Sequence, residues 1–340
     1  MSLVQWALLF LAATAVLVRA GIALARAGDE IATRTRLGGL LVGMLLMAAA
    51  TSLPEAVTVI SAAATGAPDL AVGGVFGSSM GNMAVLAVID LVHRRHRVWT
   101  LVELGQARVA SVAIALTGLA TVGAATPEGF TFGWVGFDTV LVAVGYVAAL
   151  GWIRRSPQPA PARVPTGPFP QPTEIGVVTH PSGAVRQAAA RFAVASLAVL
   201  ASGPLVTLSA ERIARDIGLA ETFAGVTLLA VATSLPELVT SLGAVRIGSY
   251  DLAVGNLFGS NAVNLIMLLG ADLVYTKGPI LSGAHPAQVV AGVAAMGLMA
   301  VALAAIVHGE ETRISRLEPD ALLLLLAYAG SLAAVWATAG

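Results

Sequence analysis

One short segment of the sequence, in which a threonine, a proline and a glutamate stand close together, occurs twice. Thr-Ser-Leu-Pro-Glu runs from Thr51 to Glu55 and again from Thr233 to Glu237. Within each copy the threonine and the glutamate are four residues apart, so on a helix they share one face. Hydroxyl and carboxylate oxygens are hard ligands, which suit Ca²⁺ and Na⁺ better than zinc or copper. The segment therefore predicts two sets of oxygen ligands for such cations.

The prolines of these segments add backbone oxygens to the same small volume. Pro54 and Pro236 have no N–H to donate, and each ring pushes on the preceding helical turn. The broken hydrogen-bond ladder should free the carbonyls of Ala50 and Ala232 and loosen their neighbours. Each copy therefore offers a hydroxyl, a carboxylate and loosened carbonyls together.

A second duplicated motif, Gly-Ser-x-x-x-Asn, offers neutral oxygens. Ser78 and Asn82 are four residues apart, as are Ser260 and Asn264. Small residues of this kind also let membrane helices pack closely and hydrogen-bond to one another. Because the motif accompanies the Pro-Glu segment in both halves of the sequence, we favour cation ligation over packing alone.

The composition is that of a polytopic membrane protein. The chain has 340 residues, of which 57% are hydrophobic and 11% charged, with a mean hydropathy of +0.85. A soluble domain carries about 25% charged residues. The 19 basic residues balance the 19 acidic ones, so no basic excess exists to bind nucleic acid. The absence of cysteine excludes disulfides, thiolate metal sites and cysteine catalysis.

Ten segments of the sequence are long and apolar enough to span a bilayer, which takes about 20 residues. The first resembles a signal peptide, but it lacks a basic region before its apolar run, so we interpret it as a mature helix. The predicted spans are 3–24, 36–64, 69–92, 107–124, 132–153, 187–209, 218–246, 251–274, 285–308 and 320–339.

The basic residues predict the orientation of these spans. Fifteen arginines fall in the odd-numbered connections and only three basic residues in the even-numbered ones. Basic residues favour the cytoplasm, so both termini are predicted to lie outside. The connection 154–186 is rich in proline, which predicts an extended or disordered cytoplasmic linker. It divides the chain into five spans over 1–153 and five over 187–340.

The two halves match without gaps at one constant offset, which aligns Thr51 with Thr233. Thirteen of the 24 positions in 69–92 are identical in 251–274. Because each half holds an odd number of spans, the second must enter the membrane upside down. Inverted repeats are typical of secondary transporters, whose substrates bind near the midplane between the repeats.

A glutamate in the middle of a span is costly, by about 2.5–3.5 kcal/mol on insertion scales. One way to lower this cost is to protonate the side chain and bond it to a neighbouring helix. A bound cation is the alternative, and we favour it because Glu55 and Glu237 occupy matching positions in the two repeats.

Five aspartates also lie in or beside the spans. Asp69 and Asp251 fall just before helices, where N-capping explains them better than ion binding does. Asp90 and Asp272 stand near the opposite ends of the same helices, where a vestibule role and a structural role are equally plausible. Asp138 has no counterpart in the other repeat, and its role is left open.

Together these motifs make the sequence similar to the cation/Ca²⁺ exchanger superfamily, specifically to Na⁺/Ca²⁺ exchangers. The two alpha repeats of that family resemble 48–90 and 230–272, and Gly-Asn-Leu-Phe-Gly-Ser-Asn-Ala-Val-Asn at 255–264 resembles its second-repeat motif. The resemblance implies a set of ion ligands in which two alanines contribute carbonyls. They are Ala48, Thr51, Ser52, Glu55, Ser78, Asn82, Ala230, Thr233, Ser234, Glu237, Ser260 and Asn264.

The sequence departs from this family pattern at several positions. Ala50 and Ala232 replace the usual glycine before the duplicated segment, and Gly74 stands where asparagine is common. Asn264 occupies a position that is aspartate in K⁺-dependent members, which argues against K⁺ co-transport. The first repeat is the weaker match.

We therefore expect an all-α polytopic membrane protein built as two inverted five-helix repeats. The resemblance implies an antiporter that exchanges Na⁺ for Ca²⁺ by alternating access, with helices 1 and 6 sliding over the core. An H⁺/Ca²⁺ exchanger using the same carboxylates is the alternative, although the proton-coupled branch resembles Gly-Asn-x-x-Glu at this position. An intramembrane enzyme is disfavoured because no histidine lies in the middle of a span to act as a base. A non-transporting scaffold would not need two buried carboxylates.

The expected substrates are Ca²⁺ and Na⁺, with no cofactor and no nucleic-acid partner. We expect the chain to lie in the inner membrane of a prokaryote, surrounded by the lipid bilayer, and to work as a monomer.

Overall fold

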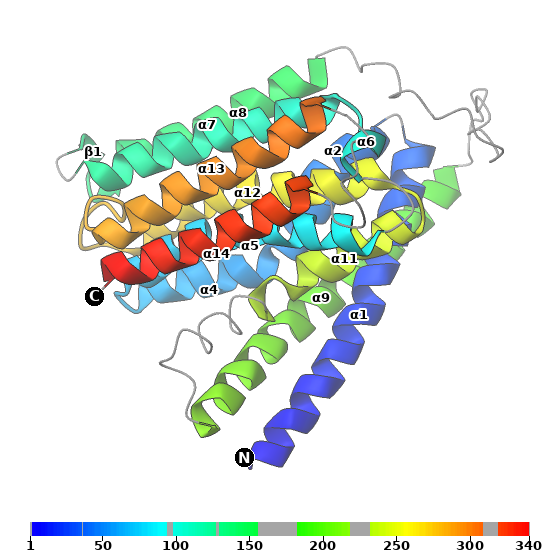
Figure 1. Ribbon diagram of the computed structural model, residues 1–340, viewed down its shortest axis with the longest axis horizontal. Coiled ribbons are helices and arrows are strands. Elements are labelled where there is room, and N and C mark those ends of the chain that lie inside the picture. Colours follow the sequence, from blue (N-terminus) through cyan, green and yellow to red (C-terminus); the bar gives the residue numbers. More distant parts are fainter. Residues whose placement is uncertain are drawn as a thin grey trace.

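The computed structural model describes residues 2–35, 37–93, 98–126, 129–155, 182–217, 232–308 and 319–339. These residues are mostly helical (Figure 1). In chain order the helices and strands are α1 (Leu3–Arg34), α2 (Gly38–Leu41), the π-helix η1 (Val42–Met47), α3 (Ala48–Thr51), α4 (Leu53–Ala64), α5 (Pro68–Val92), α6 (Val98–Leu101), α7 (Gly105–Ala125), β1 (Thr131–Phe132), β2 (Val135–Gly136), α8 (Phe137–Arg155), α9 (Ser182–Asp216), α11 (Leu235–Arg246), α12 (Tyr250–Val274), α13 (Pro286–His308) and α14 (Pro319–Ala339).

Nine of the ten predicted spans have a counterpart among the described residues. Eight single helices there are long and apolar enough to cross a membrane, and a bent pair, Gly38–Thr51 with Leu53–Ala64, makes a ninth. The predicted span 218–246 lies partly outside the described residues, which include only residues 232–246 of it. Most of the predicted linker 154–186 lies outside them as well.

One predicted span is bent, and another begins later than predicted. The segment 36–64 bends by 50° between α3 and α4, which agrees with the helix disruption expected before Pro54. The fifth span does not begin at residue 132, because residues 131–136 form the antiparallel hairpin β1–β2, which turns at Gly133 with a φ of 68°. A left-handed φ favours glycine and interrupts a helix, so α8 starts only at Phe137.

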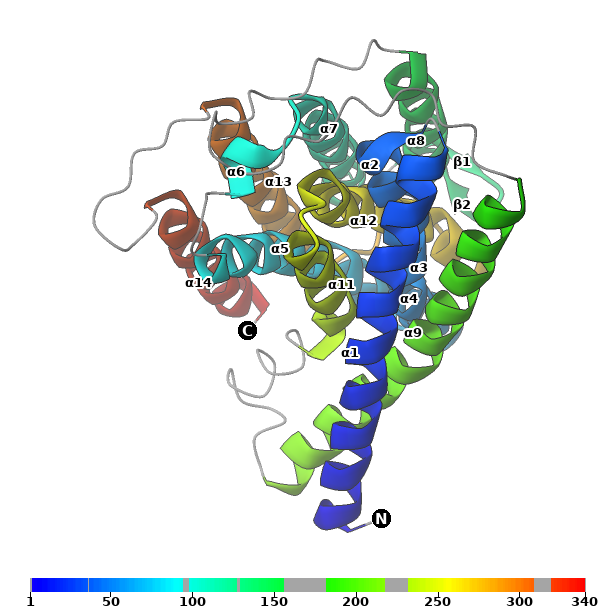
Figure 2. The ribbon, with the colours of Figure 1, turned by 90° about the vertical axis from the view of Figure 1, so that its right-hand side faces the viewer.

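Helix α12 occupies the centre of the molecule. It contacts α4, α5, α7, α8 and α11 and also the short helices that precede the bend in the second span (Figure 2). Several of its large apolar side chains, among them Leu252, Leu257 and Phe258, are completely buried. The second-repeat motif therefore lies inside the bundle, whereas α14 lies at its edge.

Glycines bring the backbone of α12 against η1. A Cβ placed on Gly259 would lie 2.6 Å from both the Cα and the carbonyl oxygen of Met44. One placed on Gly43 would lie 2.7 Å from the carbonyl oxygen of Leu252. A real Cβ does not approach backbone so closely, so this helix crossing requires glycine at both positions.

Helices α1 and α9 run side by side at a steep angle to the other long helices (Figures 1 and 2). They are antiparallel: Arg212, near the end of α9, lies over the ring of Trp6 near the start of α1, with 5.9 Å from the guanidinium carbon to the ring centre. At the other end of the pair, Arg191 forms a 3.2 Å salt bridge with Glu30.

This pair touches the rest of the bundle through glycines at equivalent positions in the two repeats. Gly203 of α9 faces both duplicated prolines, since its Cβ would lie 3.0 Å from Pro54 Cγ and 3.7 Å from Pro236 Cγ. Gly21 of α1, its counterpart in the first repeat, faces Val239 and Thr240 of α11. The pair therefore rests directly on the helices that carry the duplicated glutamates.

We predict that Gly259→Ala destabilises the protein, because the added methyl group overlaps the Met44 backbone. Overpacking of this kind costs about 1–3 kcal/mol. The measurement is the thermal unfolding midpoint of the purified protein in detergent. The control is Gly297→Ala in α13, where no described atom lies within 4 Å of the added Cβ. The control should be neutral or slightly stabilising, since alanine favours helix over glycine. Equal midpoints for the two variants would contradict the close crossing.

Candidate functional site

Both copies of the duplicated segment break their helix at the serine. Ser52 separates α3 from α4 with φ −86° and ψ 0°, and Ser234 precedes α11 with φ −88° and ψ 3°. The backbone N–H of Ser52 still reaches the Ala48 carbonyl at 3.0 Å. The break therefore comes two residues before each proline. In the first copy it follows the π-helix η1, a feature that frequently marks functional sites.

The two glutamates lie together in the interior. Glu237 is 1% exposed, and all four carboxylate oxygens of Glu55 and Glu237 are buried. None of the four accepts a hydrogen bond of ordinary geometry from the described part of the chain. The carboxyl groups are close enough to interact electrostatically with each other. Two acidic groups therefore share one buried space.

Thr51 connects the first copy of the segment to α12 of the second repeat. Its hydroxyl lies 3.2 Å from Asn256 Oδ1, 3.4 Å from the Ser260 hydroxyl and 3.4 Å from the Ala48 carbonyl. Asn256 in turn donates to Thr240 and Ser241 of α11 at 3.3 and 3.0 Å. A chain of buried hydrogen bonds thus runs from α3 through α12 to α11.

Asparagines join α5 to α12 at the same depth. Asn82 Nδ2 donates to Asn261 Oδ1 at 2.8 Å, and Asn264 Nδ2 donates to the Ser78 hydroxyl at 3.0 Å. The amide oxygens of Asn82 and Asn264 are buried and accept no hydrogen bond from the described residues. These neutral acceptors are of the type that Ca²⁺ and Na⁺ bind.

The structure places the predicted ligands as follows. Ala48, Thr51, Ser52, Asn82, Ser234, Glu237, Ser260 and Asn264 are buried; Glu55, Ser78 and Thr233 are partly buried; and Ala230 lies outside the described residues. Ser52 Oγ is buried without a described partner, whereas Ser234 packs on Gly81 of α5, whose Cβ would lie 2.9 Å from the Ser234 hydroxyl.

Two buried asparagines were missed by the sequence reasoning. Asn256 and Asn261 are completely buried and hold Thr51 and Asn82 respectively. The first repeat has Gly74 and Ser79 at the matching positions, so neither residue belongs to a motif present in both repeats. The sequence feature that could have identified them is the high number of asparagines in one apolar span, since each buried amide needs a hydrogen-bond partner.

The chemistry of this cluster is that of a cation site with few charges. Among the described residues, no group of three or more His, Cys, Asp or Glu side chains is arranged to hold a metal ion. The cluster instead combines two carboxylates with hydroxyl and amide oxygens. Such a donor set suits weakly held, exchangeable hard cations better than a permanently bound transition metal.

The comparison with protein families agrees with this chemistry. The family described as sodium/calcium exchanger protein matches residues 5–153 and 188–337, which is most of the chain. The chain belongs to the sodium/calcium exchanger family. Membership places it among multi-pass membrane proteins and cation/Ca²⁺ antiporters rather than enzymes.

Individual relatives of this exchanger-family chain are distant. It is 28% identical over 308 residues to CaxA of Alkalimonas amylolytica, a protein named provisionally as an antiporter, and covers 89% of each chain. It is 27% identical over 245 residues, or 71% of each chain, to the inner membrane protein YrbG of Escherichia coli. Among solved structures, the sodium-calcium exchanger NCX_Mj in 10 mM Na⁺ matches 98% of this chain and 99% of its own with a TM-score of 0.74 at 20% identity, which establishes the shared fold.

Two aspartates of this family member connect its two repeats reciprocally. Asp69 of α5 accepts the backbone N–H of His285 at 2.7 Å, and Asp251 of α12 accepts that of Glu103 at 2.8 Å. The two acceptors occupy equivalent positions of the repeats, and so do the two donors. Such exchange of equivalent contacts is what two repeats make across an approximate two-fold axis.

The predicted N-capping role of Asp69 and Asp251 was therefore wrong. Ala67 and Ser249 are the N-cap residues, and neither helix has a side-chain cap. The aspartates lie in the first helical turn and accept hydrogen bonds from the chain just before α13 and α7.

Asp90 and Asp272 have structural roles. Asp90 accepts the Val98 backbone N–H and the Trp99 indole N–H, both at 2.7 Å. Asp272 accepts the Ile280 backbone N–H, again eight residues onward, at 2.7 Å. Asp272 also accepts bonds from Gly136 and Thr139, which tie β2 and the first turn of α8 to the end of α12. Asp138 accepts the Thr139 backbone N–H at 2.8 Å, and its carboxylate packs against Gly123 of α7 and Gly136 of β2.

We predict that Glu103→Gln stabilises the protein at neutral pH. Burial, and secondly the nearby charge of Asp251, raise the pKa of Glu103. A carboxyl whose pKa is higher in the folded state costs stability as the pH rises from its unfolded value through the raised one. The variant should therefore unfold at a higher temperature than the wild type at pH 7, with the difference vanishing below about pH 4.

The control for this prediction is the same substitution in an Asp251→Asn background. Asparagine keeps an acceptor for the Glu103 N–H but removes the charge, so the gain should shrink. A gain that does not depend on pH would show that the Glu103 charge is not the cause.

Proposed function

We propose that this chain exchanges Na⁺ for Ca²⁺ by alternating access, with the ions bound between Glu55 and Glu237. The observation that carries the proposal is a set of four buried carboxylate oxygens from two equivalent segments. They accept no hydrogen bond of ordinary geometry from the described residues. A buried charge needs a partner. A Ca²⁺ ion supplies two positive charges at this position, and Na⁺ ions supply the same charge separately.

Competition for these carboxylates couples the two ions. The empty site leaves two acidic groups facing each other in an apolar interior, which disfavours its passage across the membrane. The loaded site is close to neutral with either one Ca²⁺ or several Na⁺. Strict exchange requires that the site changes its access when ions are bound and not when it is empty. The charge balance alone gives this behaviour.

The neutral oxygens complete the proposed coordination. Thr51, Ser52, Ser78 and Asn82 from the first repeat, with Thr233, Ser234, Ser260 and Asn264 from the second, are proposed as ligands beside the glutamates. Carbonyl oxygens at Ala48 and Ala230 are proposed to complete the set. With asparagine at 264 the site has two carboxylates, which favours Na⁺ and Ca²⁺ without K⁺.

The same geometry suggests how access alternates. The steep pair α1–α9 touches both duplicated prolines through Gly203, so a shift of this pair changes the surroundings of the two segments together. We propose that α1 and α9 slide over the core that contains α4, α5, α11 and α12, and so open the site first to one side and then to the other.

We predict that an outward-directed Na⁺ gradient drives ⁴⁵Ca²⁺ into proteoliposomes that contain the purified chain. Because Na⁺ and Ca²⁺ compete for one site, Na⁺ leaving the lumen should exchange for Ca²⁺ entering it. Collapse of an imposed pH gradient should leave this uptake unchanged. Uptake driven by a pH gradient without Na⁺ would establish the H⁺/Ca²⁺ alternative instead.

We predict that Glu55→Gln and Glu237→Gln each abolish Ca²⁺ transport while the protein still folds. At an effective dielectric constant of about 20 and a few ångströms, loss of one carboxylate removes on the order of several kcal/mol of attraction for a divalent ion. A loss of 1.4 kcal/mol already lowers affinity about tenfold. Ca²⁺ flux per inserted protein should fall below about one hundredth of wild type.

The matched control is Asp69→Asn, which also converts a carboxylate to an amide. Its oxygen can still accept the His285 N–H, so flux should stay near wild type. Size-exclusion chromatography and unfolding midpoints report folding of all three variants. Normal flux in either glutamine variant would refute the paired-carboxylate site, and aggregation of both would point to a structural role.

A further inference from the structure

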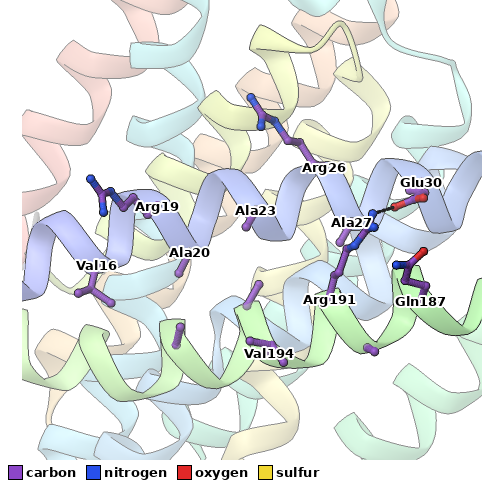
Figure 3. A pocket seen from close by; sticks show the side chains of 13 residues that line it. Val16, Arg19, Ala20, Ala23, Arg26, Ala27, Glu30, Gln187, Arg191 and Val194 are labelled. Carbon is purple, nitrogen blue, oxygen red and sulfur yellow. Dashed lines mark hydrogen bonds and ion pairs between the residues drawn. The ribbon is translucent and has the colours of Figure 1, made fainter.

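A groove of about 760 Å³ runs along the outer side of the α1–α9 pair (Figure 3). Its walls are mostly small apolar side chains. Ala20, Ala23 and Ala27 lie on α1, and Ala190 and Ala198 lie on α9. The groove is separate from the paired glutamates, and the proposed exchange does not use it.

Helices α1 and α9 expose large apolar side chains, including Val194, which lines the groove. Leu8 and Leu11 of α1 are 61% and 62% exposed, and Val194 and Leu197 of α9 are 68% and 64% exposed. In a membrane-spanning chain such side chains contact acyl chains. The groove therefore opens toward lipid and not toward water.

Two arginines line the α1 side of this apolar groove. Arg19 and Arg26 are seven residues apart, so they share one helix face about 10 Å apart along the axis. Figure 3 shows them projecting from the same side of α1. Both are exposed, and neither has a salt bridge within the described residues.

The single carboxylate that lines the groove is already engaged. Glu30 forms salt bridges with Arg34 at 2.7 Å and with Arg191 of α9 at 3.2 Å. Among the described residues, Arg19 and Arg26 therefore have no counter-charge, although Arg19 follows directly on the apolar stretch of α1. An unpaired arginine within a bilayer is costly unless it reaches a phosphate at the membrane surface.

We propose that this groove binds one anionic phospholipid. The phosphate pairs with Arg26 and with Arg19, whose long side chain reaches toward the membrane surface. One acyl chain lies along the alanines between α1 and α9. The arginine distribution of the sequence places this end of the pair in the cytoplasm, and the cytoplasmic leaflet is the one that basic clusters recognise.

A lipid fits this groove better than a soluble anion or a peptide does. A soluble anion has no apolar part to fill the alanine-lined channel. A peptide would bury backbone polar groups at a lipid-facing surface, where they lack partners. A phospholipid fits both the charge and the shape of the groove. Its phosphate pairs with the arginines, and its acyl chain fills the alanine-lined channel.

Native mass spectrometry of the full chain, titrated with phosphatidylglycerol or phosphatidylcholine, tests this proposal. We expect one phosphatidylglycerol to be retained at least about tenfold more tightly than phosphatidylcholine. Arg19→Gln/Arg26→Gln should remove that preference. The matched control, Arg155→Gln/Arg246→Gln, removes two exposed arginines away from the groove and should retain it.

A second variant tests the acyl-chain channel without touching a charge. Ala23→Trp fills the groove at an exposed position and should weaken phosphatidylglycerol binding about as much as the double arginine variant does. Retention of the lipid preference in either groove variant would overturn the proposal. Displacement of the lipid by soluble glycerol phosphate at equal concentration would also overturn it, because the site would then recognise the anion alone.

Discussion

Two carboxylates that share one buried space are the constraint on which the rest of this structure depends. In an ordinary core, Glu55 and Glu237 would be a defect, since two like charges in a buried space repel each other. The chain nevertheless places them at equivalent positions of two repeats and surrounds them with oxygens. Burial of two acidic groups in one space needs compensation, either by protonation or by a bound cation. The rest of the fold can be understood as the means of keeping that space both closed and accessible.

The neighbouring elements follow from this constraint. The helix must break for Thr51 and Glu55 to approach α12, and the break at Ser52 with the π-helix before it provides the turn. The approach also needs backbone at close range, which the glycines of η1 and α12 allow. Asn256 then fixes Thr51, because its amide reaches α3 on one side and α11 on the other. The site is thus held by helices from both repeats, and no single helix determines its geometry.

The sequence predicted the spans and the duplicated motifs well, because both depend on local patterns. Hydropathy located nine spans that the described residues confirm, and the constant offset between the two halves identified the equivalent positions.

Local patterns do not show which distant residue a polar side chain will bind in the folded protein. The capping role expected for Asp69 is correct for a helix in isolation, but its actual donor, His285, lies 216 residues away. Asn256 was missed for the same reason, because its hydrogen bonds are to α3 and α11, which it contacts only in the folded protein. The hairpin before α8 was missed because Phe132 and Trp134 are as apolar as the span they precede.

The reciprocal contacts of Asp69 and Asp251 have a consequence for how the chain is made. Translation completes the first repeat before the second exists, so Asp69 enters the membrane long before His285 can reach it. The helices of the first repeat are therefore inserted before their partners are made, and they can pack fully only after α12 and α13 have been synthesised. A chain whose synthesis stopped after the first half would leave Asp69 without the N–H of His285. Two such halves could supply each other's missing partners, because the first half carries both the acceptor Asp69 and, in Glu103, the equivalent of the donor His285.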